Sequence, residues 1–293
     1  MRKSEGIIAG ADWCYQSQVS CNSSCIGPGK WDEFAALCDG RAQSPINIVT
    51  RKTLLDERLT PFKFTGYQEA FHGLIKNNGH SVEVDLHHSA MISGSSLETS
   101  YRAAQMHLHW GKNGGPGSEH TIDGEQYPME LHIVHVKQKY SSLAEALLDP
   151  TGVAVLGFFY ETSTSVNRKY EPIISALKNI TKSGSNTSLS GVSLDMLIPE
   201  HENMTTYYRY QGSLTTPGCT EAVVWTIFEN TIPLSKEQLS AFSELEFRNG
   251  EKMTGTFRPV QPVNGRQVHR SGGGTVLASA MLLVTSVIAS IGL

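Results

Sequence analysis

Apolar and polar residues alternate in several short stretches along the chain, a pattern that is typical of half-buried β-strands. Five such stretches are also rich in β-branched and aromatic residues and are predicted strands: 81–86, 101–111, 129–140, 153–161 and 223–230. Apolar residues at helical spacing occur in 170–180, and Ser235 to Gln238 has the sequence of a capping box that would start a short helix. No repeat or linker interrupts 13–265, so the pattern predicts one mainly β (β-rich α+β) domain with short peripheral helices.

The composition then limits the function classes. Charged residues make up 18% of the 293 residues and hydrophobic residues 39%, which excludes a disordered polyampholyte. The 24 basic residues against 28 acidic ones give a formal charge of −4, which offers no electrostatic footprint for nucleic acid. We therefore expect a globular protein without a nucleic-acid partner.

The C-terminal end of the chain carries no charge. Nothing after Arg270 is charged, and 276–293 lacks the polar face that a buried helix shows. A transmembrane helix is one alternative, but no basic residues follow the apolar run. Small residues from Ser271, a weakly polar spacer and an apolar tail favour a GPI-attachment signal. We expect 267–293 to be this signal, removed on maturation, with Ser271 as the GPI attachment residue.

The other end of the chain points to the secretory pathway. A basic start followed by Ala9-Gly10-Ala11 resembles the end of a signal peptide, so 1–12 is interpreted as a remnant of one or an N-terminal extension, and the folded domain as 13–266. Four N-x-S/T sequons are candidate glycosylation sites: Asn22, Asn179, Asn186 and Asn203. Five cysteines fit an oxidising compartment. The sequence alone does not decide how they pair, and the odd number leaves one cysteine outside any pair.

Histidines form the most informative cluster. His107 and His109 are two residues apart on a predicted strand, so their side chains leave the same face. His132 lies on the next predicted strand, and if the two strands adjoin, three imidazoles meet in a zinc site with an open fourth position. Gln105 and Glu130 each precede one of these histidines by two residues and are expected to accept its second N–H. The alternative is a set of hydrogen-bonded core or surface histidines, which an isolated His-x-His would favour.

Longer motifs connect this cluster to a known family. Five blocks resemble the signature sequences of the α-class carbonic anhydrases: Gln43–Ile48, Asn77–His80, His107–Gly111, Ser118–Val134 and Gly212–Pro217. They occur in the family's order within 13–261. The resemblance implies a single domain around a large, mainly antiparallel twisted sheet. It also implies a Zn2+ enzyme that interconverts carbon dioxide and bicarbonate plus a proton.

The resemblance assigns roles to individual residues. It makes His107, His109 and His132 the zinc ligands, with Gln105 and Glu130 as their hydrogen-bond partners. Three further residues have catalytic roles. Glu119 and Thr215 orient a zinc-bound hydroxide, and His80 is the proton shuttle. The positions that line the substrate pocket are Val134, Val155, Leu214, Thr216, Val223 and Trp225. The chemistry is consistent, because zinc lowers the pKa of a bound water to about 7 and a histidine with a pKa near 6.5 can relay the proton.

A subgroup within this family is also indicated. Trp13-Cys14-Tyr15 and the Cys219 region resemble the GPI-anchored type IV carbonic anhydrases, which implies disulfides Cys14–Cys25 and Cys38–Cys219 and leaves Cys21 over. Glu83 departs from the resemblance, because many relatives keep a small polar residue there. The expected location is the extracellular face of the cell membrane, for a monomer held by its GPI lipid, with bicarbonate transporters as candidate partners.

A non-catalytic binding module on the same fold is the alternative function. Some relatives in the family serve as adhesion or receptor domains and have lost zinc-ligand histidines. All three histidines are present here, which favours the enzyme.

Overall fold

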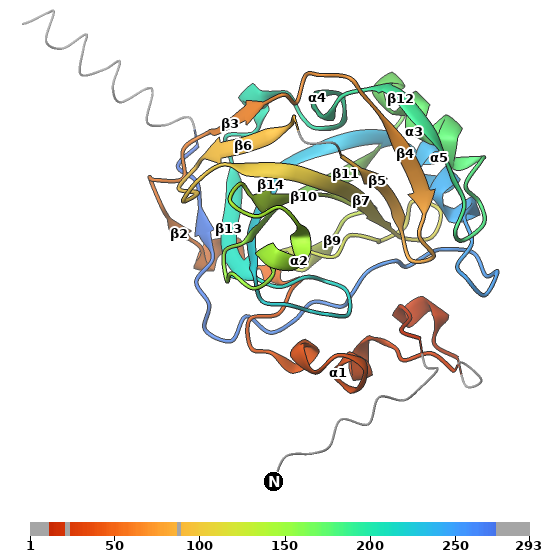
Figure 1. Ribbon diagram of the computed structural model, residues 1–293, viewed down its shortest axis with the longest axis horizontal. Coiled ribbons are helices and arrows are strands. Elements are labelled where there is room, and N and C mark those ends of the chain that lie inside the picture. Colours follow the sequence, from red (N-terminus) through yellow and green to blue (C-terminus); the bar gives the residue numbers. More distant parts are fainter. Residues whose placement is uncertain (1–11, 21–23, 87–88, 274–293) are drawn as a thin grey trace, which may run out of the picture.

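A large twisted sheet forms the centre of the protein (Figure 1). The computed structural model describes residues 12–20, 24–86 and 89–273. Ten strands follow one another in hydrogen-bonded order: β12 (Asn186–Val192), β4 (Phe71–Asn77), β5 (Val82–Asp85), β7 (Tyr101–Trp110), β10 (Met129–Lys137), β11 (Val153–Ser163), β14 (Val223–Ser235), β13 (Tyr207–Gly212), β15 (His269–Arg270) and β2 (Leu54–Leu55). Most neighbouring strands are antiparallel, while β14 runs parallel to β11 and β2 parallel to β15.

Smaller elements complete the sheet and cover it. Strands β3 (Phe62–Thr65) and β6 (Met91–Gly94) pair with each other, and β6 also pairs with β7. A separate small sheet contains β1 (Asn47–Ile48), β8 (Thr121–Ile122) and β9 (Glu125–Gln126). The α-helices are α1 (Trp31–Phe34), α2 (Leu143–Ala146), α3 (Glu171–Leu177), α4 (Leu194–Leu197) and α5 (Lys236–Ala241). The 3-10 helices are Gln16–Gln18, Pro28–Lys30, Ala36–Asp39, Thr50–Lys52, Arg168–Tyr170, His201–Asn203 and Phe242–Glu244.

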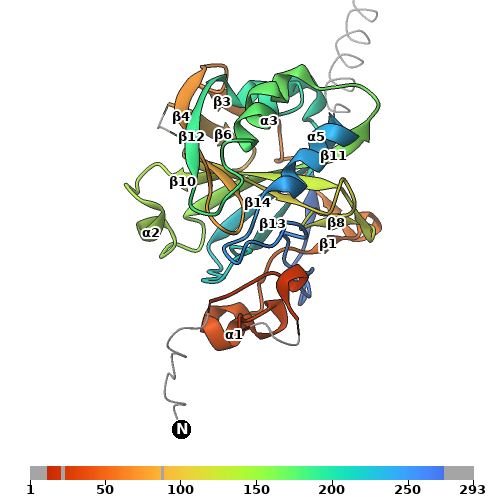
Figure 2. The same ribbon diagram turned by 90° about the vertical axis from the view of Figure 1, so that its right-hand side faces the viewer.

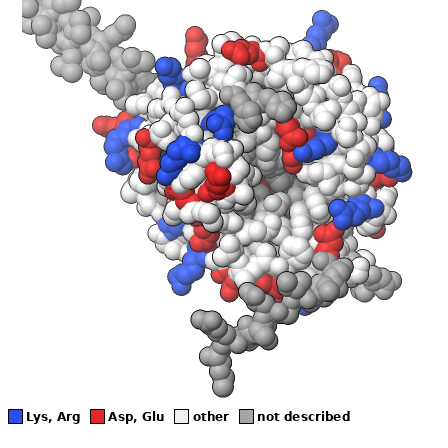
Figure 3. Space-filling view, viewed as in Figure 1, with Lys and Arg blue, Asp and Glu red and all other residues white. Residues whose placement is uncertain are grey.

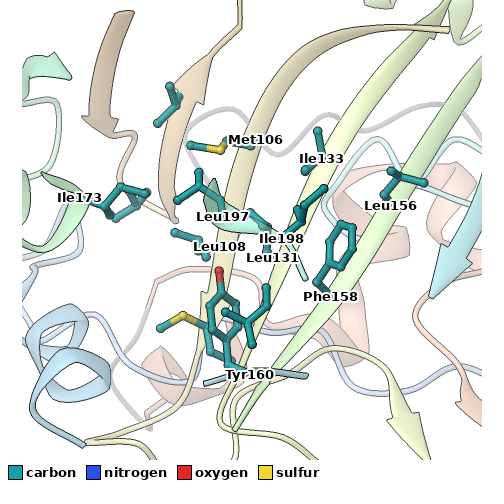
Figure 4. Close-up of a cluster of buried hydrophobic side chains, with 14 of the residues drawn as sticks. Met106, Leu108, Leu131, Ile133, Leu156, Phe158, Tyr160, Ile173, Leu197 and Ile198 are labelled. Atoms are coloured by element: carbon teal, nitrogen blue, oxygen red, sulfur yellow. The ribbon is translucent and has the colours of Figure 1, made fainter. Parts of the chain in front are cut away.

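One face of the sheet is covered by helices and is called the packed face here. Alternation along β7 points Met106 and Leu108 to this face, where Leu131 of β10 joins them. Side chains from β11, α3 and α4 approach the same cluster (Figure 4). The residues of β7 that alternate with Met106 and Leu108, including His107 and His109, point to the opposite face. That face is called the histidine face. The sheet therefore separates an apolar core from the candidate site.

The N-terminal segment lies at the edge of the molecule in both ribbon views, away from α3 (Figures 1 and 2). Its disulfide Cys14–Cys25 closes a short loop, and a second disulfide, Cys38–Cys219, joins the segment to the loop after β13. Both pairings implied by the resemblance are therefore confirmed. Cys21, the sequon at Asn22 and the apolar tail 276–293 lie outside the described residues. Within the described ranges, no helix is long and apolar enough to cross a membrane.

The five predicted strands are confirmed as β5, β7, β10, β11 and β14. The helix predicted at 170–180 is α3, and Ser235 caps α5 in a complete capping box with Gln238. Several strands were not predicted, among them β4, β12 and β13. In β4 burial alternates but the sequence does not follow it, because Gly73 and Asn77 are buried while Leu74 is exposed.

Basic and acidic side chains alternate over the surface seen in Figure 3. Neither sign dominates this side of the molecule. Sequons at Asn179, Asn186 and Asn203 all lie at exposed positions. Ser271 is fully buried, and its hydroxyl donates to the carbonyl of Thr205 at 2.7 Å.

Candidate active site

Strand register brings the three predicted ligand histidines together on the histidine face. His107 of β7 lies directly opposite His132 of β10, and His109 lies opposite Glu130. Directly opposed residues of neighbouring strands share a face of the sheet. Gly157 of β11 is the next residue in the row, opposite His132. A Cβ atom there would come within 2.7 Å of Ile227 Cδ1 and 3.3 Å of Glu130 Oε1, so only glycine leaves these side chains in place.

The outer nitrogen of each imidazole has its own acceptor. His107 Nδ1 lies 2.8 Å from Gln105 Oε1, and His132 Nε2 lies 2.7 Å from Glu130 Oε1. His109 Nδ1 lies 2.6 Å from the backbone carbonyl of Thr256. Because each partner oxygen can only accept, the outer nitrogens carry the protons. The inner nitrogens, Nε2 of His107 and His109 and Nδ1 of His132, are then free lone pairs.

These inner nitrogens converge on one point. The ligand atoms of the three residues all lie within 4.8 Å of one another, and His132 Nδ1 is 3.2 Å from His107 Nε2. His109 Nε2 is buried and has no hydrogen-bond partner among the described residues. Burial lowers the pKa of all three histidines, to about 3 for His109, so the rings are neutral. Converging lone pairs without protons repel one another, and a tetrahedral cation such as zinc fits this donor set.

Glu130 organises the surroundings of the cluster. Its Oε2 accepts the backbone N–H groups of Glu119 and His120, each at 2.8 Å, and its Oε1 contacts both His120 Nδ1 and His132 Nε2. Burial alone would raise the pKa of Glu130, but the two flanking histidines lower it well below its usual range. His120, Glu130 and His132 could also be arranged as metal donors. The other nitrogen of His120 already lies 2.6 Å from the Tyr210 hydroxyl, so this trio is a hydrogen-bond network.

Glu119 and Thr215 lie beside the histidines. Glu119 Oε2 is 3.4 Å from His109 Nε2 and has no hydrogen-bond partner in the described part of the chain, whereas Oε1 accepts the backbone N–H of Arg258 at 2.8 Å. Burial raises the pKa of Glu119 well above its usual range, while Arg258 and the side chain of Thr215 act in the opposite direction. A dication at the three histidines would add to this lowering, because Oε2 faces it directly.

An apolar wall adjoins the site on the same face. Val134, Val155 and Trp225 are consecutive members of one cross-strand row through β10, β11 and β14. The Trp225 ring centroid lies 4.8 Å from that of His132. Val223 belongs to the same buried cluster and Leu214 packs against it. Thr216 is half-buried in the following loop, where its carbonyl accepts the N–H of Cys219 at 2.9 Å.

His80 lies in the turn between β4 and β5, outside the histidine cluster. Asn78 Oδ1 accepts the backbone N–H of His80 at 2.9 Å, and Gly79 occupies a left-handed conformation with φ +92°. The imidazole stacks on Trp13, with ring centroids 3.8 Å apart, and its Nδ1 is buried with no partner within 12–20, 24–86 and 89–273. Burial lowers the pKa of His80. Tyr15 is a further neighbour, with its ring 6.5 Å from that of His80, and burial together with the charge of Glu119 raises the pKa of its phenol.

Some contributors to the site were not predicted. The Thr256 carbonyl and the Arg258 N–H are backbone groups, which have no sequence signature. His120 belongs to the Ser118–Val134 block but was given no role. Glu130, ten residues later, is the sequence signal that could have revealed its hydrogen-bond role. The stacking of Trp13 on His80 depends on a loop whose path the sequence did not reveal.

Comparisons with known proteins agree with this geometry. The family model of the eukaryotic-type carbonic anhydrases matches residues 26–272. "Carbonic anhydrase 4" of Rattus norvegicus is 42% identical over 274 residues, which cover 92% of this chain and 88% of the rat protein. "Carbonic anhydrase 15" of Mus musculus is 38% identical over 301 residues, covering 98% of this chain and 91% of that protein. "Carbonic anhydrase 7" of Homo sapiens is 38% identical over 256 residues, or 84% of this chain and 94% of that protein.

Proposed function

The chain belongs to the eukaryotic-type carbonic anhydrases, enzymes that interconvert carbon dioxide and bicarbonate, and we propose that it does so with a zinc ion held by His107, His109 and His132. The convergence of three neutral imidazole nitrogens, each fixed by an acceptor on its outer side, carries this proposal. When bound, zinc would act as a Lewis acid that lowers the pKa of a water molecule to about 7.

Thr215 and Glu119 orient the reacting oxygen. Ionised Glu119 can only accept a hydrogen bond, so the Thr215 hydroxyl donates to it and is left with acceptor capacity toward the reacting oxygen. The O–H group of that oxygen then donates to Thr215 and turns a lone pair toward the substrate. Val134, Val155 and Trp225 offer carbon dioxide an apolar wall, with Leu214 and Val223 packed around them. Bicarbonate is charged and gains little from that wall, which favours its release.

His80 moves the proton produced in each turnover. Its imidazole can accept a proton, and because burial lowers its pKa it releases that proton readily to buffer. The Asn78 turn and the stack on Trp13 fix the ring, with Tyr15 as its other aromatic neighbour. Thr216 completes the set as a contact for bicarbonate.

The test combines metal content with activity. Purified protein is expected to hold one zinc per chain and to hydrate carbon dioxide in stopped-flow assays. Activity should be lost on full chelation and return with added zinc. Hydration that continues after complete zinc removal contradicts the proposal. Full zinc binding without hydration would favour the alternative function, a non-catalytic cell-surface binding module.

We also propose that the enzyme works at the extracellular face of the cell membrane, held by a GPI lipid. Two disulfides and exposed sequons at Asn179, Asn186 and Asn203 suit the secretory pathway. Ser271 remains the proposed attachment residue, and because it is buried against β13, the GPI transfer would have to precede its packing. Domain bounds of 13–266 with flanking signal segments 1–12 and 267–293, the monomeric state and transporter partners remain predictions. Release from cells by phosphatidylinositol-specific phospholipase C tests the anchor, and a retained protein carrying 281–293 contradicts it.

A further inference from the structure

The row of residues that contains the histidines continues toward the edge of the sheet with charged residues. Glu83 of β5 lies directly opposite His107, and Lys76 of β4 lies directly opposite Glu83. Because opposed residues share a face with Cβ atoms about 5 Å apart, the Glu83 side chain leaves the sheet beside His107, on the histidine face. Val82 and Val84, on either side of it, are buried on the packed face.

Two carboxylates share one ammonium at this place. Lys76 Nζ lies 2.9 Å from Glu83 Oε1 and 3.0 Å from Asp85 Oδ2, and Asp85 is the residue opposite Gln105. The Glu83 side chain is only 21% exposed, so its charge is screened less than that of a surface residue. One positive and two negative charges leave a net negative charge next to the candidate metal site.

Glu83 is also held in place from the other side. Asn78 Nδ2 donates to Glu83 Oε2 at 2.9 Å, and the Oδ1 of the same amide accepts the N–H groups of His80 and Ser81. The carboxylate is therefore fixed by Lys76 and by the turn that carries His80. A fixed charge exerts a constant field on the candidate metal site, whereas a mobile side chain would swing into solvent.

We propose that Glu83 is a specificity-determining residue that weakens the binding of anions at the metal site. This inference rests on the proposed zinc site. Its field opposes bicarbonate and other small anions that reach the metal, and it leaves the approach of uncharged carbon dioxide unaffected. A unit charge about 10 Å away through a partly aqueous medium changes anion affinity about threefold to fivefold. Bicarbonate formed at this site would leave correspondingly faster.

Cobalt-substituted protein provides a readout that does not depend on turnover. Cobalt(II) replaces zinc in nitrogen-donor sites, and its visible spectrum changes when an anion binds. Titration with thiocyanate at pH about 6, below the pKa of a metal-bound water, gives the anion affinity without competition from hydroxide. Glu83→Gln should tighten thiocyanate binding about threefold to fivefold, and Lys76→Gln should weaken it by a similar factor.

Glu200→Gln is the matched control. Glu200 pairs with Lys169 at 2.9 Å, so the variant loses the same charge from a similar ion pair, but at the exposed surface next to α4. Its thiocyanate affinity should equal that of the unchanged protein. Melting curves of all variants with cobalt bound verify that each is folded.

The outcomes separate the two proposals. A folded protein that takes up no cobalt overturns the zinc site and this inference with it. A protein that takes up cobalt but binds thiocyanate equally with and without the Glu83 carboxylate overturns this inference alone. Equal tightening in Glu83→Gln and Glu200→Gln also overturns it, because net charge rather than position would then be responsible.

Discussion

The two faces of the central sheet are made by the same strands, yet their buried residues differ in kind. On the packed face, Met106, Leu108 and Leu131 contact other apolar side chains, and the contacts are not directional. On the histidine face, His109 and Glu130 are buried as well and His107 is half-buried, but each has a specific partner at hydrogen-bond distance. Substitutions on the packed face should therefore lower the stability of the fold. Substitutions on the histidine face should lower metal binding and catalytic activity.

The largest effect is expected at a ligand histidine. His107→Ala removes one of three donors, so zinc affinity and hydration activity should each fall by more than about 100-fold. Loss of a ligand's hydrogen-bond partner alone costs about 10-fold to 100-fold, and loss of the ligand itself should cost more. Met106→Leu, its neighbour on the packed face, should keep both. Metal analysis and stopped-flow assays measure the pair, and a fully active His107→Ala enzyme would contradict the assignment.

Loss of the orienting hydroxyl comes next. Thr215→Val keeps the shape of the side chain but cannot donate to Glu119 or accept from the reacting oxygen. We expect kcat/KM for hydration to fall by about 100-fold, as when one stabilising hydrogen bond of an active site is removed. Zinc content should not change. Thr220→Val in the same loop serves as the control, and an equal loss in both variants would indicate a general disturbance of the loop.

A smaller effect is expected for the proton relay. His80→Ala should lower kcat about tenfold in weak buffer, a modest loss for a proton-transfer group, and leave kcat/KM unchanged. Added imidazole should restore the rate. His72→Ala, at an exposed position of β4, is the control. An unchanged kcat in weak buffer would remove His80 from the mechanism.

The acid sensitivity of the packed face can be tested through His135. This residue is buried next to Tyr67 of the packed-face core, 2.6 Å from its hydroxyl, and burial lowers the pKa of His135 to about 4. The unfolded chain then binds more protons than the folded one below pH about 6.5, so the free energy of unfolding falls as the pH drops, by about 3 kcal/mol at pH 4.

His135→Gln should remove this contribution. The expected result is a shallower loss of stability between pH about 6.5 and 4 than in the unchanged protein. Denaturant unfolding at a series of pH values measures both slopes. Identical slopes would show that His135 does not contribute to the acid sensitivity.

Much of this comparison could be predicted from the sequence, because strand alternation fixes which residues share a face. The spacing of His107 and His109, and of Glu130 and His132, was enough to group the ligands with their partners. The sequence could not supply the register of β5 against β7, so Glu83 was noticed only as a departure from relatives. Loop contacts were equally hidden, because the carbonyl of Thr256 and the ring of Trp13 reach the site from distant segments.

X-ray absorption at the zinc edge of the purified protein tests the central claim most directly. The account predicts one zinc per chain with three imidazole nitrogens at about 2.0 Å and one oxygen donor, and one fewer nitrogen in any zinc that His107→Ala retains. A zinc bound through sulfur, a spectrum unchanged by His107→Ala, or no stoichiometric zinc would contradict it.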